Sequence, residues 1–488
     1  MKDSQELKEN INTDVCIIGT GIGGLTTAYL LTKSGKKVTL LEMDQVASGQ
    51  SARTTAQISY EIDERYDYVS NRLGKEIAKL VADSQNAALN KIAEIVKTEN
   101  ISCSFEYVTA YLYCPPGEKD DLDSELKALH EVGLTETYIS EESAVNCFRT
   151  GRNIVFPKQA QFHPLEYLKA LREIIVNKGG QIFTSTKATN VESSGNQVII
   201  TTEKGNTITA NHVVVATNSP MNDRLAIHTK QAPYRTYVIG AKIPKGSVNK
   251  GIFWDTLDPY HYIRLYEEKD HDVLIIGGED HKTGQSDDET EPFVNLEAWS
   301  KVRFPMIEEV TYKWSGQVQE PADGLAFLGK NPGDDNVYII TGDSGTGMTN
   351  CTIGAMIISD LINGKANDWE TAYSPSRLSV GGAETFIKEN INVAAQFTDW
   401  VSPGDVKSEN DLSNGQGAVI RDGLLKLAVY KDENGQVHKC SAVCPHLGCI
   451  VDWNNLEKSF DCPCHGSRFD AYGKVITAPT SKDLEKIS

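Results

Sequence analysis

Long apolar runs are absent from this chain of 488 residues. The longest stretches, such as Val213-Val-Val-Ala216, have the length of a single strand, whereas a membrane-spanning helix needs roughly 20 apolar residues. Residues 1–13 are charged and polar, so we expect a flexible lead-in there and not a secretory signal. The sequence therefore predicts a protein with no membrane span.

Basic residues are in the minority. The chain holds 48 Lys+Arg against 67 Asp+Glu, for a formal net charge of −19. Such an excess of negative charge repels phosphate backbones and anionic lipids, so we expect neither nucleic acid nor a membrane surface as a partner. The length exceeds one typical core, which predicts two or three domains.

Cysteines are scarce over most of the sequence and crowded near its end. The ten cysteines fall into two groups: five show no framework spacing, and five lie between residues 440 and 464. Scattered cysteines without a framework are typical of a reducing compartment, so we expect a cytoplasmic protein. The scattered group is Cys16, Cys103, Cys114, Cys147 and Cys351.

The N-terminal part reads as an α/β fold. Residues 14–42 give strand, glycine-rich turn, helix and strand, a βαβ unit that implies a parallel sheet. Helical patterns follow at 71–98, 121–132, 164–178 and 353–362, and strand patterns at 181–183, 187–191, 197–202, 207–209, 212–216, 260–265, 272–277 and 337–341. We expect one large α/β domain over 14–370 with an inserted β-rich region at about 232–320.

The C-terminal part has a different character. Residues 371–411 read as a connection that contains a Gly381-Gly382 pair and one amphipathic helix at 385–400. From 412 to 488 only short strands and turns occur, including an Asn434-Gly435 hairpin signal. We expect a small all-β domain there.

Two short loops in this tail carry metal-binding side chains at paired spacing. They are Cys444-Pro-His-Leu-Gly-Cys449 and Cys462-Pro-Cys-His-Gly-Ser467. Two thiolates and two imidazoles would suit zinc. The loops more closely resemble those of the Rieske [2Fe–2S] proteins of cytochrome bc and b6f complexes, in which two histidines replace two cysteines on one iron.

This resemblance assigns roles to six side chains. It implies that Cys444 and Cys462 bind one iron, that His446 and His465 bind the other, and that Cys449 and Cys464 form a disulfide between the loops. High-potential members of the family have Tyr where this chain has Phe469. One hydrogen bond to a ligand sulfur is then missing, which predicts a lower reduction potential.

The turn Gly19-Thr-Gly-Ile-Gly-Gly24 follows a strand and opens a helix, as in dinucleotide-binding sites. Gly19 allows the sharp turn, Gly21 lets a pyrophosphate approach the helix N-terminus, and Gly24 lets helix and sheet pack closely. Glu42 ends the next strand and could accept hydrogen bonds from ribose hydroxyls. The motif alone leaves FAD and NAD open.

Three later segments decide between these cofactors. Residues 48–57, 213–218 and 338–348 resemble the D-amino-acid oxidase, glycine oxidase and sarcosine oxidase family of flavoproteins, in which they line FAD. Some sarcosine oxidases bind the flavin through a cysteine that has no counterpart around Lys313-Trp-Ser-Gly316, so we expect FAD without a covalent bond. The predicted FAD-binding residues are Gly19, Gly21, Ile22, Gly23, Gly24, Glu42, Met43, Gln50, Ser51, Thr54, Thr55, Ala56, Val191, Ala216, Thr217, Gly342, Asp343, Gly345, Thr346, Gly347 and Met348.

The sequence identifies the substrate-binding residues less clearly than the cofactor-binding residues. Arg264 could bind a substrate carboxylate through two parallel donors, although a structural arginine is an equal alternative. His163 and His261 are further candidates that local packing would explain equally well. No catalytic residue is assigned.

Together the two resemblances imply an FAD-dependent enzyme that oxidises a C–N bond of an amine or amino acid. Its electrons would pass singly through the Rieske cluster to an external acceptor. Two alternatives remain, a reductase component that supplies another enzyme and a redox sensor without catalysis. A Rieske oxygenase is set aside, because the sequence has no Asp-x-x-His-x₄-His arrangement for a mononuclear iron.

Overall fold

The computed structural model describes residues 5–119, 121–222, 227–286, 288–377 and 383–487. Residues 1–4 and the Gly381-Gly382 pair of the expected connection lie outside these ranges. The α-helices are α1 (Ile22–Lys33), α2 (Tyr66–Leu73), α3 (Lys75–Thr98), α4 (Leu122–Glu131), α5 (Pro164–Asn177), α6 (Glu291–Arg303), α7 (Gly347–Ile362), α8 (Glu370–Tyr373) and α9 (Ala383–Gln396), and the 3-10 helices are η1 (Gln50–Ala52), η2 (His228–Lys230), η3 (Phe397–Trp400) and η4 (Glu409–Asp411).

The first sheet has a parallel centre in the order β17, β10, β1, β2, β7, with β16 and the β8–β9 hairpin added antiparallel. Its central strands are apolar and buried, as expected for a sheet that is covered on both faces. Helices α1 and α7 pack against each other beside it. The strands are β1 (Ile11–Ile18), β2 (Val38–Leu41), β7 (Gln181–Phe183), β8 (Ala188–Ser194), β9 (Gln197–Thr202), β10 (Thr207–Asn218), β16 (Phe327–Lys330) and β17 (Val337–Thr341).

The second sheet is mostly antiparallel and extends beyond the region expected at 232–320. Strand β12 pairs parallel to β4, and this pairing brings strands from residues 57–161 into the same sheet. Its strands are β3 (Gln57–Ile58), β4 (Glu106–Tyr113), β5 (Tyr138–Ser140), β6 (Asn153–Gln161), β11 (Gln231–Ile243), β12 (Ile252–Asp255), β13 (His261–Glu267), β14 (Asp272–Lys282) and β15 (Glu309–Pro321).

The tail is all-β, and the fold class predicted from the sequence is confirmed. A three-stranded sheet is followed by a four-stranded one, and residues 432–436, including the predicted Asn434-Gly435 turn, connect two strands of the first. The strands are β18 (Gln416–Asp422), β19 (Leu425–Lys431), β20 (Val437–Ser441), β21 (Asp452–Asn454), β22 (Ser459–Asp461), β23 (Arg468–Asp470) and β24 (Val475–Thr477).

Three local predictions differ from the structure. The helical pattern at 71–98 is divided between α2 and α3, because Gly74 adopts φ +95° between them. The two strands expected at 207–209 and 212–216 form one strand, β10. The expected lead-in is partly structured, since Leu7 is buried and its N–H donates to Thr186 Oγ1 at 3.1 Å.

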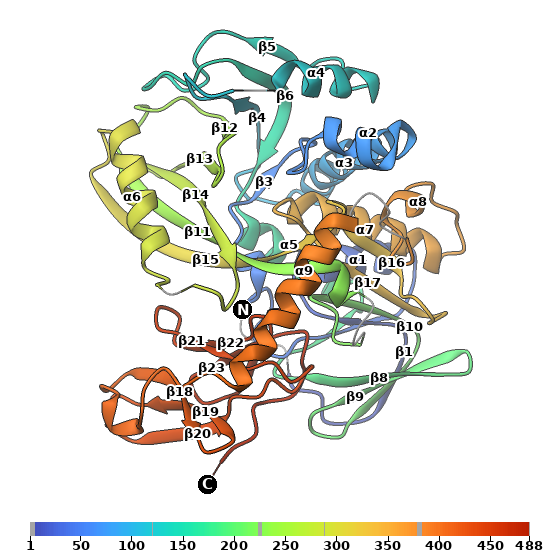
Figure 1. The fold of residues 1–488 in the computed structure, drawn as a ribbon. Coiled ribbons are helices and arrows are strands. Elements are labelled where there is room, and N and C mark those ends of the chain that lie inside the picture. Colours follow the sequence, from blue (N-terminus) through green and yellow to red (C-terminus); the bar gives the residue numbers. More distant parts are fainter. Residues whose placement is uncertain (1–4, 120, 223–226, 287, 378–382, 488) are drawn as a thin grey trace.

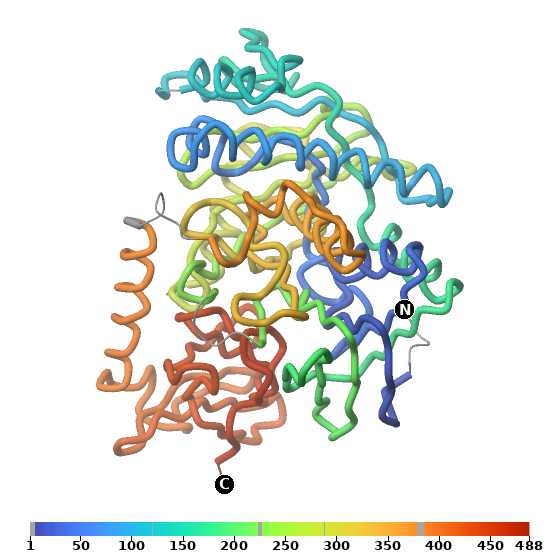
Figure 2. The backbone as a smooth tube through the Cα atoms, turned by 90° about the vertical axis from the view of Figure 1, so that its right-hand side faces the viewer, coloured from blue at the N-terminus to red at the C-terminus, as the bar shows by residue number. Residues whose placement is uncertain are grey.

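The all-β tail lies below the second sheet and beside the lower end of the first (Figure 1). Helix α9 runs down to the tail along one side of the molecule, as Figure 2 shows from the perpendicular direction. It is held by both parts that it connects: Glu389 pairs with Lys282 at 2.5 Å, and Asn392 accepts a hydrogen bond from Gln285, whose amide also donates to Pro463 O. The connection therefore fixes the tail on the α/β body.

Candidate functional site

One cavity of about 930 Å³ extends through the α/β body, large enough for a dinucleotide cofactor. It contains residues from both sheets and from the tail. The predicted FAD-binding residues in its wall are Gly19, Gly21, Ile22, Gly23, Glu42, Met43, Gln50, Ser51, Thr54, Thr55, Ala216, Thr217, Asp343, Gly345, Thr346, Gly347 and Met348.

The glycine-rich turn has the close backbone approaches that its sequence predicts. A Cβ on Gly19 would lie 2.4 Å from Ala216 O, and one on Gly24 would lie 2.0 Å from Gly19 O. Gly21 is the N-cap of α1, and Ser51 Oγ accepts a hydrogen bond from the Ile22 N–H at 2.9 Å. The turn therefore opens the helix N-terminus to the cavity, as pyrophosphate binding requires.

Four predicted residues do not line the cavity. Gly24 lies behind the turn, and Ala56 is fully buried with φ +57°. A Cβ on Gly342 would lie 2.7 Å from Pro321 Cγ, so this glycine serves a close packing contact. Val191 packs in the core beside the first sheet, and the preceding residues Ser185–Ala188 line the wall in its place.

Glu42 contributes its carboxylate to the cavity wall, at the end of the βαβ unit. The carboxylate accepts hydrogen bonds from Thr20 Oγ1 at 2.7 Å and from the Thr20 N–H at 3.1 Å. Burial raises its pKa. The position agrees with the predicted contact to a ribose, although the nearby hydroxyl of Thr20 was not foreseen.

The tail contributes to the same cavity, which the sequence did not indicate. Residues 474–478 line it beside the first sheet. Asp483 pairs with Lys187 at 3.0 Å, and Ser481 Oγ donates to Thr189 O at 3.2 Å. These contacts join segments almost 300 residues apart, so no local motif could have predicted them.

The opposite end of the cavity is acidic and aromatic. Its wall includes the carboxylates of Glu61, Asp63 and Asp280 and the rings of Trp254, Tyr260 and Tyr262. Asp63 lies close to the glycine-rich turn before α7, because a Cβ on Gly345 would be 3.6 Å from its Oδ2. Burial raises the pKa of Asp63 and of Asp280 to about 7.

The three residues considered for substrate binding lie outside this wall. Arg264 is buried in β13, where burial lowers its pKa to about 10. His261 Nδ1 lies 2.9 Å from Asp255 Oδ2, and its ring stacks on Trp299. His163 Nδ1 accepts from the Glu166 N–H at the start of α5. Local packing, the alternative considered for the two histidines, therefore accounts for both of them.

The two cysteine–histidine loops have matching backbone turns. Gly448 N donates to Cys444 O at 3.0 Å, and Gly466 N donates to Cys462 O at 3.1 Å. Both glycines have positive φ, +83° and +77°. The turns bring the histidine rings of His446 and His465 to 5.0 Å between centroids.

The donor set of these loops suits an iron–sulfur cluster. The buried thiols of Cys444 and Cys462 share a hydrogen bond, which lowers the pKa of Cys444, and the Ser467 hydroxyl also contributes. Burial lowers the pKa of His465 to about 4, which keeps its imidazole neutral and able to bind a metal. Its Nδ1 is buried with no hydrogen-bond partner among the described residues.

A disulfide joins the loops between Cys449 and Cys464, the pair that the resemblance implied. Its two sulfurs and that of Cys462 all lie within 4.8 Å of one another. The disulfide is therefore next to one predicted cluster ligand, Cys462.

The histidine side of the loops faces the α/β body. The ring of His228, from η2, lies 4.8 Å from that of His446 and 5.9 Å from that of His465. Gln317 in β15 bridges the two parts: its N–H donates to Gln50 Oε1 at 2.8 Å, and its side chain donates to Gly466 O at 3.0 Å. One residue thus links the predicted flavin-lining segment to the loop that carries His465.

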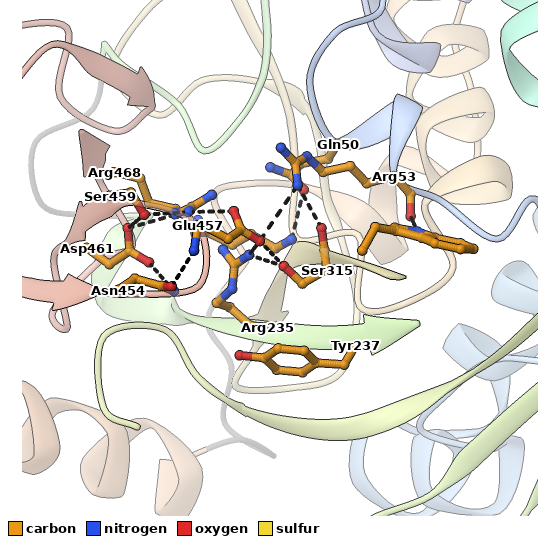
Figure 3. Close-up of polar contacts among 12 residues, drawn as sticks. Gln50, Arg53, Arg235, Tyr237, Ser315, Asn454, Glu457, Ser459, Asp461 and Arg468 are labelled. Atoms are coloured by element: carbon orange, nitrogen blue, oxygen red, sulfur yellow. Dashed lines mark hydrogen bonds and ion pairs between the residues drawn. The ribbon is translucent and has the colours of Figure 1, made fainter. Parts of the chain in front are cut away.

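A buried charge network fixes this arrangement (Figure 3). Glu457 of the tail contacts Arg235 and Ser315 of the second sheet, and it pairs with Arg468 at 2.7 Å. Arg53, which follows η1, lies 3.8 Å from the same carboxylate. Arg468 and Arg235, with Arg53, hold the pKa of Glu457 down to about 2.

In the ranges that the structure covers, no helix has both the length and the apolar character to cross a bilayer.

Comparison with known proteins agrees with both parts of the site. Residues 14–361 match the family model described as FAD dependent oxidoreductase, and residues 402–488 match the Rieske [2Fe-2S] domain. A relative from Bacillus subtilis, YhfW, named as a Rieske 2Fe-2S iron-sulfur protein, is 32% identical over 99% of this chain and 94% of its own.

Two further matches each cover one part. The iron-sulfur subunit of the cytochrome b6-f complex of Parasynechococcus marenigrum is 35% identical over 23% of this chain and 60% of its own length. The glycine oxidase of Geobacillus kaustophilus has a similar fold over 75% of this chain and 99% of its own, with a TM-score of 0.62 and 18% identity. The chain belongs to the FAD dependent oxidoreductase family and carries, after the FAD-binding part, a Rieske [2Fe-2S] domain.

Proposed function

We propose that this enzyme oxidises a C–N bond of an amine or amino acid and passes the electrons singly, through its Rieske cluster, to an external one-electron acceptor. The proposal includes the division into residues 14–370, a connection at 371–411 and the Rieske domain at 412–488. It also keeps the cluster ligands Cys444, His446, Cys462 and His465 and the predicted FAD-binding residues.

The observation that carries the proposal is the placement of the cluster loops. Their histidines contact His228 of the FAD-binding part, and Gln317 joins the Gly466 carbonyl to Gln50 in the cavity wall. If the Rieske domain received its electrons from a source other than the flavin, its histidine side would not need to face the flavin cavity. The fold likeness to a glycine oxidase supports C–N chemistry at the other end of the route.

The chain's own residues would orient and stabilise the reactants. The N-termini of α1 and α7 both open into the cavity, and each favours negative charge, α1 for a pyrophosphate and α7 beside the Gly345–Met348 turn. FAD, when bound, supplies two-electron oxidation and can release electrons one at a time. Trp254, Tyr260 and Tyr262 enclose the far end and exclude water from it.

The test is an anaerobic screen of amines and amino acids with the purified holoenzyme. Flavin absorbance and the EPR signal of the reduced cluster are followed together after mixing. We expect one substrate class to bleach the flavin and then to produce the cluster signal. Flavin reduction that never reached the cluster would contradict the relay, and a flavin that no amine reduced would favour a redox sensor or a reductase component.

We expect the flavin to leave the polypeptide on denaturation. The segment before β16 that resembles the covalent site of some sarcosine oxidases, Lys313-Trp-Ser-Gly316, contains no cysteine. Cys351 lies in the cavity wall but is half-buried, and burial raises the pKa of its thiol, which makes it a poor nucleophile. Acid precipitation should leave all of the FAD in the supernatant; yellow colour in the protein pellet would contradict this.

Phe469→Tyr is expected to raise the midpoint potential of the cluster. Phe469 is fully buried in the same apolar cluster as Cys444 and Cys462, so a hydroxyl added there could donate to a ligand sulfur. A hydrogen bond to a charged group contributes about 1.5–3 kcal/mol, which corresponds to roughly 60–130 mV for one electron. Redox titration by EPR checks the shift, with Phe469→Leu, which changes the same side chain but adds no hydroxyl, as the control.

A further inference from the structure

The acidic end of the cavity has carboxylates that pair with no cationic side chain in the described part of the chain. No described Lys or Arg lies within ion-pair distance of Glu61, Asp63 or Asp280. Four of the five basic side chains of the wall are engaged elsewhere: Lys187 pairs with Asp483 and Glu203, Lys204 with Glu6, Arg468 with Glu457 and Asp461, and Arg53 contacts Ser315 O. The fifth, Lys474, is an exposed residue of the tail.

These carboxylates line the cavity, and the described residues satisfy them only in part, since Asp280 has one side-chain hydrogen bond, to Thr236. Glu61 is only 8% exposed, and its carboxylate makes no hydrogen bond or ion pair within the described ranges. Asp280 Oδ1 is buried, again with no partner among described residues. Asp63 is open to the cavity beside Gly345. An ionised carboxylate in such surroundings is costly unless a positive charge accompanies it.

Aromatic rings complete the enclosure. Tyr260 and Tyr262 lie 5.9 Å apart between ring centroids, and Trp254 is fixed by its indole N–H, which donates to Gln57 Oε1 at 2.8 Å. Ring faces attract cations electrostatically, most strongly where water is excluded. Carboxylates together with three aromatic rings make a pocket for an organic cation.

For a substrate carboxylate, by contrast, the described residues place no Lys or Arg within ion-pair distance of Glu61, Asp63 or Asp280. Arg264, the residue considered for that role, is buried in β13 outside the wall, and Arg65 also lies outside it. An amino acid would bring its carboxylate toward Asp63 and Asp280, where like charges repel. The charge of the site therefore favours amines that carry no acid group.

We propose that this end of the cavity selects an alkyl diamine or polyamine. This inference rests on the proposed function and names its substrate class. One amine, neutral, would lie toward the Gly345–Met348 turn, while the other, as an ammonium ion, would be held by Asp63, Asp280 and Glu61 and by the aromatic rings.

The reaction balances with the proposed relay. The CH₂–NH₂ group loses two electrons and two protons to form a C=N bond, which water hydrolyses to an aldehyde and ammonia. FAD takes up the electron pair, and the external one-electron acceptor removes the electrons in two steps through the cluster. No further oxidant is needed.

Binding can be tested with three probes of nearly the same length: 1,4-diaminobutane, butylamine and 4-aminobutanoate. Each is titrated into the holoenzyme under anaerobic conditions, and its dissociation constant is measured by calorimetry, with flavin bleaching followed separately. We expect the diamine to bind about 10- to 100-fold more tightly than butylamine, as loss of one charge-assisted contact implies, and 4-aminobutanoate to bind most weakly.

Two variants and a matched control identify the site. Asp63→Asn and Asp280→Asn should each weaken diamine binding about 10- to 100-fold and leave butylamine binding nearly unchanged. Glu279→Gln removes the same charge one residue away, from a side chain that contacts Asn295 and His261 outside the cavity, and should change neither. This residue controls for general loss of negative charge.

The outcomes separate the inference from the proposed function. Tighter binding of 4-aminobutanoate or glycine than of the diamine would overturn the diamine inference, and flavin bleaching by glycine would then still support C–N oxidation. Diamine binding that depends on Asp63 and Asp280 would support the inference even if the cluster signal failed to appear, a result that contradicts the relay alone.

Discussion

Replacing Cys444 with serine is expected to remove the iron–sulfur cluster while FAD remains bound. Cys444 is 1% exposed, and its thiol shares a hydrogen bond with that of Cys462, which is consistent with the proposal that the pair supplies the sulfur half of the ligand set. Loss of a ligand should exceed the effect of losing its supporting contacts, which is about 10- to 100-fold in metal affinity or activity. We expect iron and acid-labile sulfide near zero, no reduced-cluster EPR signal, and a loss of more than about 100-fold in turnover with a one-electron acceptor.

A cysteine four residues earlier gives the matched control. Cys440 is also buried, in β20, and its thiol donates to Tyr472 O at 3.6 Å and to none of the ligand side chains. Cys440→Ser should keep iron, sulfide and turnover. In the Cys444→Ser protein, substrate should still bleach the flavin, because that step lies before the cluster. Equal loss of iron in both variants would contradict the ligand assignment, and unchanged turnover in the Cys444→Ser protein would contradict the relay.

The parts of the site that depend on local spacing could be predicted from the sequence. Gly24 is needed because the backbone oxygen of Gly19, five residues earlier, lies where its Cβ would be, and such a local requirement is visible as a motif. The same holds for the two cysteine–histidine loops, each closed by a turn with a glycine at positive φ. In both cases the residues that cooperate are neighbours in the chain.

The substrate end could not be predicted in this way. Asp63 follows β3, Tyr260 precedes β13, and Asp280 lies near the end of β14, so only the pairing order of the second sheet brings them together. That sheet recruits β4 and β6 from a stretch that reads mainly as helices. Prediction of these contacts would require knowing which distant strands pair, and a single sequence has no spacing rule that gives this pairing.

The contacts between the FAD-binding part and the tail could not be predicted from the sequence either. Glu457 and Arg235 are 222 residues apart, in the turn between β21 and β22 and in β11, and no local sequence pattern around either residue indicates the other. The tail was predicted as a separate unit beside the FAD-binding part. In the structure, Arg468 and residues 474–478 of the tail instead line the flavin cavity, so the two parts form one site.

Glu457→Gln is expected to destabilise the docked Rieske domain by about 3–5 kcal/mol, because it leaves two buried arginines without their carboxylate. Arg235 is 1% exposed and Arg468 3%, whereas Glu457 itself is 16% exposed. Arg468 still pairs with Asp461 at 2.9 Å in this variant. Most of the lost stabilisation is therefore at Arg235 and at the contact between the two parts. Urea unfolding with FAD bound measures the change.

Two further variants distinguish a docking role from a general loss of charge. Glu409→Gln removes a surface carboxylate in η4, just before the tail, whose partner among the described residues is the half-exposed Lys439, and should cost less than about 1 kcal/mol. Arg235→Met combined with Glu457→Gln should recover part of the loss, because the uncompensated buried charge is then removed. Equal destabilisation by Glu409→Gln, or no recovery in the double variant, would contradict the assignment.

The pH dependence of stability gives an independent test of the same contact. The arginines hold the pKa of Glu457 at about 2, below the usual value of about 4.3 in an unfolded chain. The unfolded chain then binds more protons than the folded one, so the stabilisation is complete above about pH 5 and is lost as the pH falls through 4 toward 2. A shift of this size corresponds to about 3 kcal/mol. Glu457 is the group that titrates, so the free energy of unfolding of the Glu457→Gln protein should fall less steeply between pH 5 and pH 3 than that of the parent. Parallel curves for the two proteins would show that the network does not hold the two redox parts together.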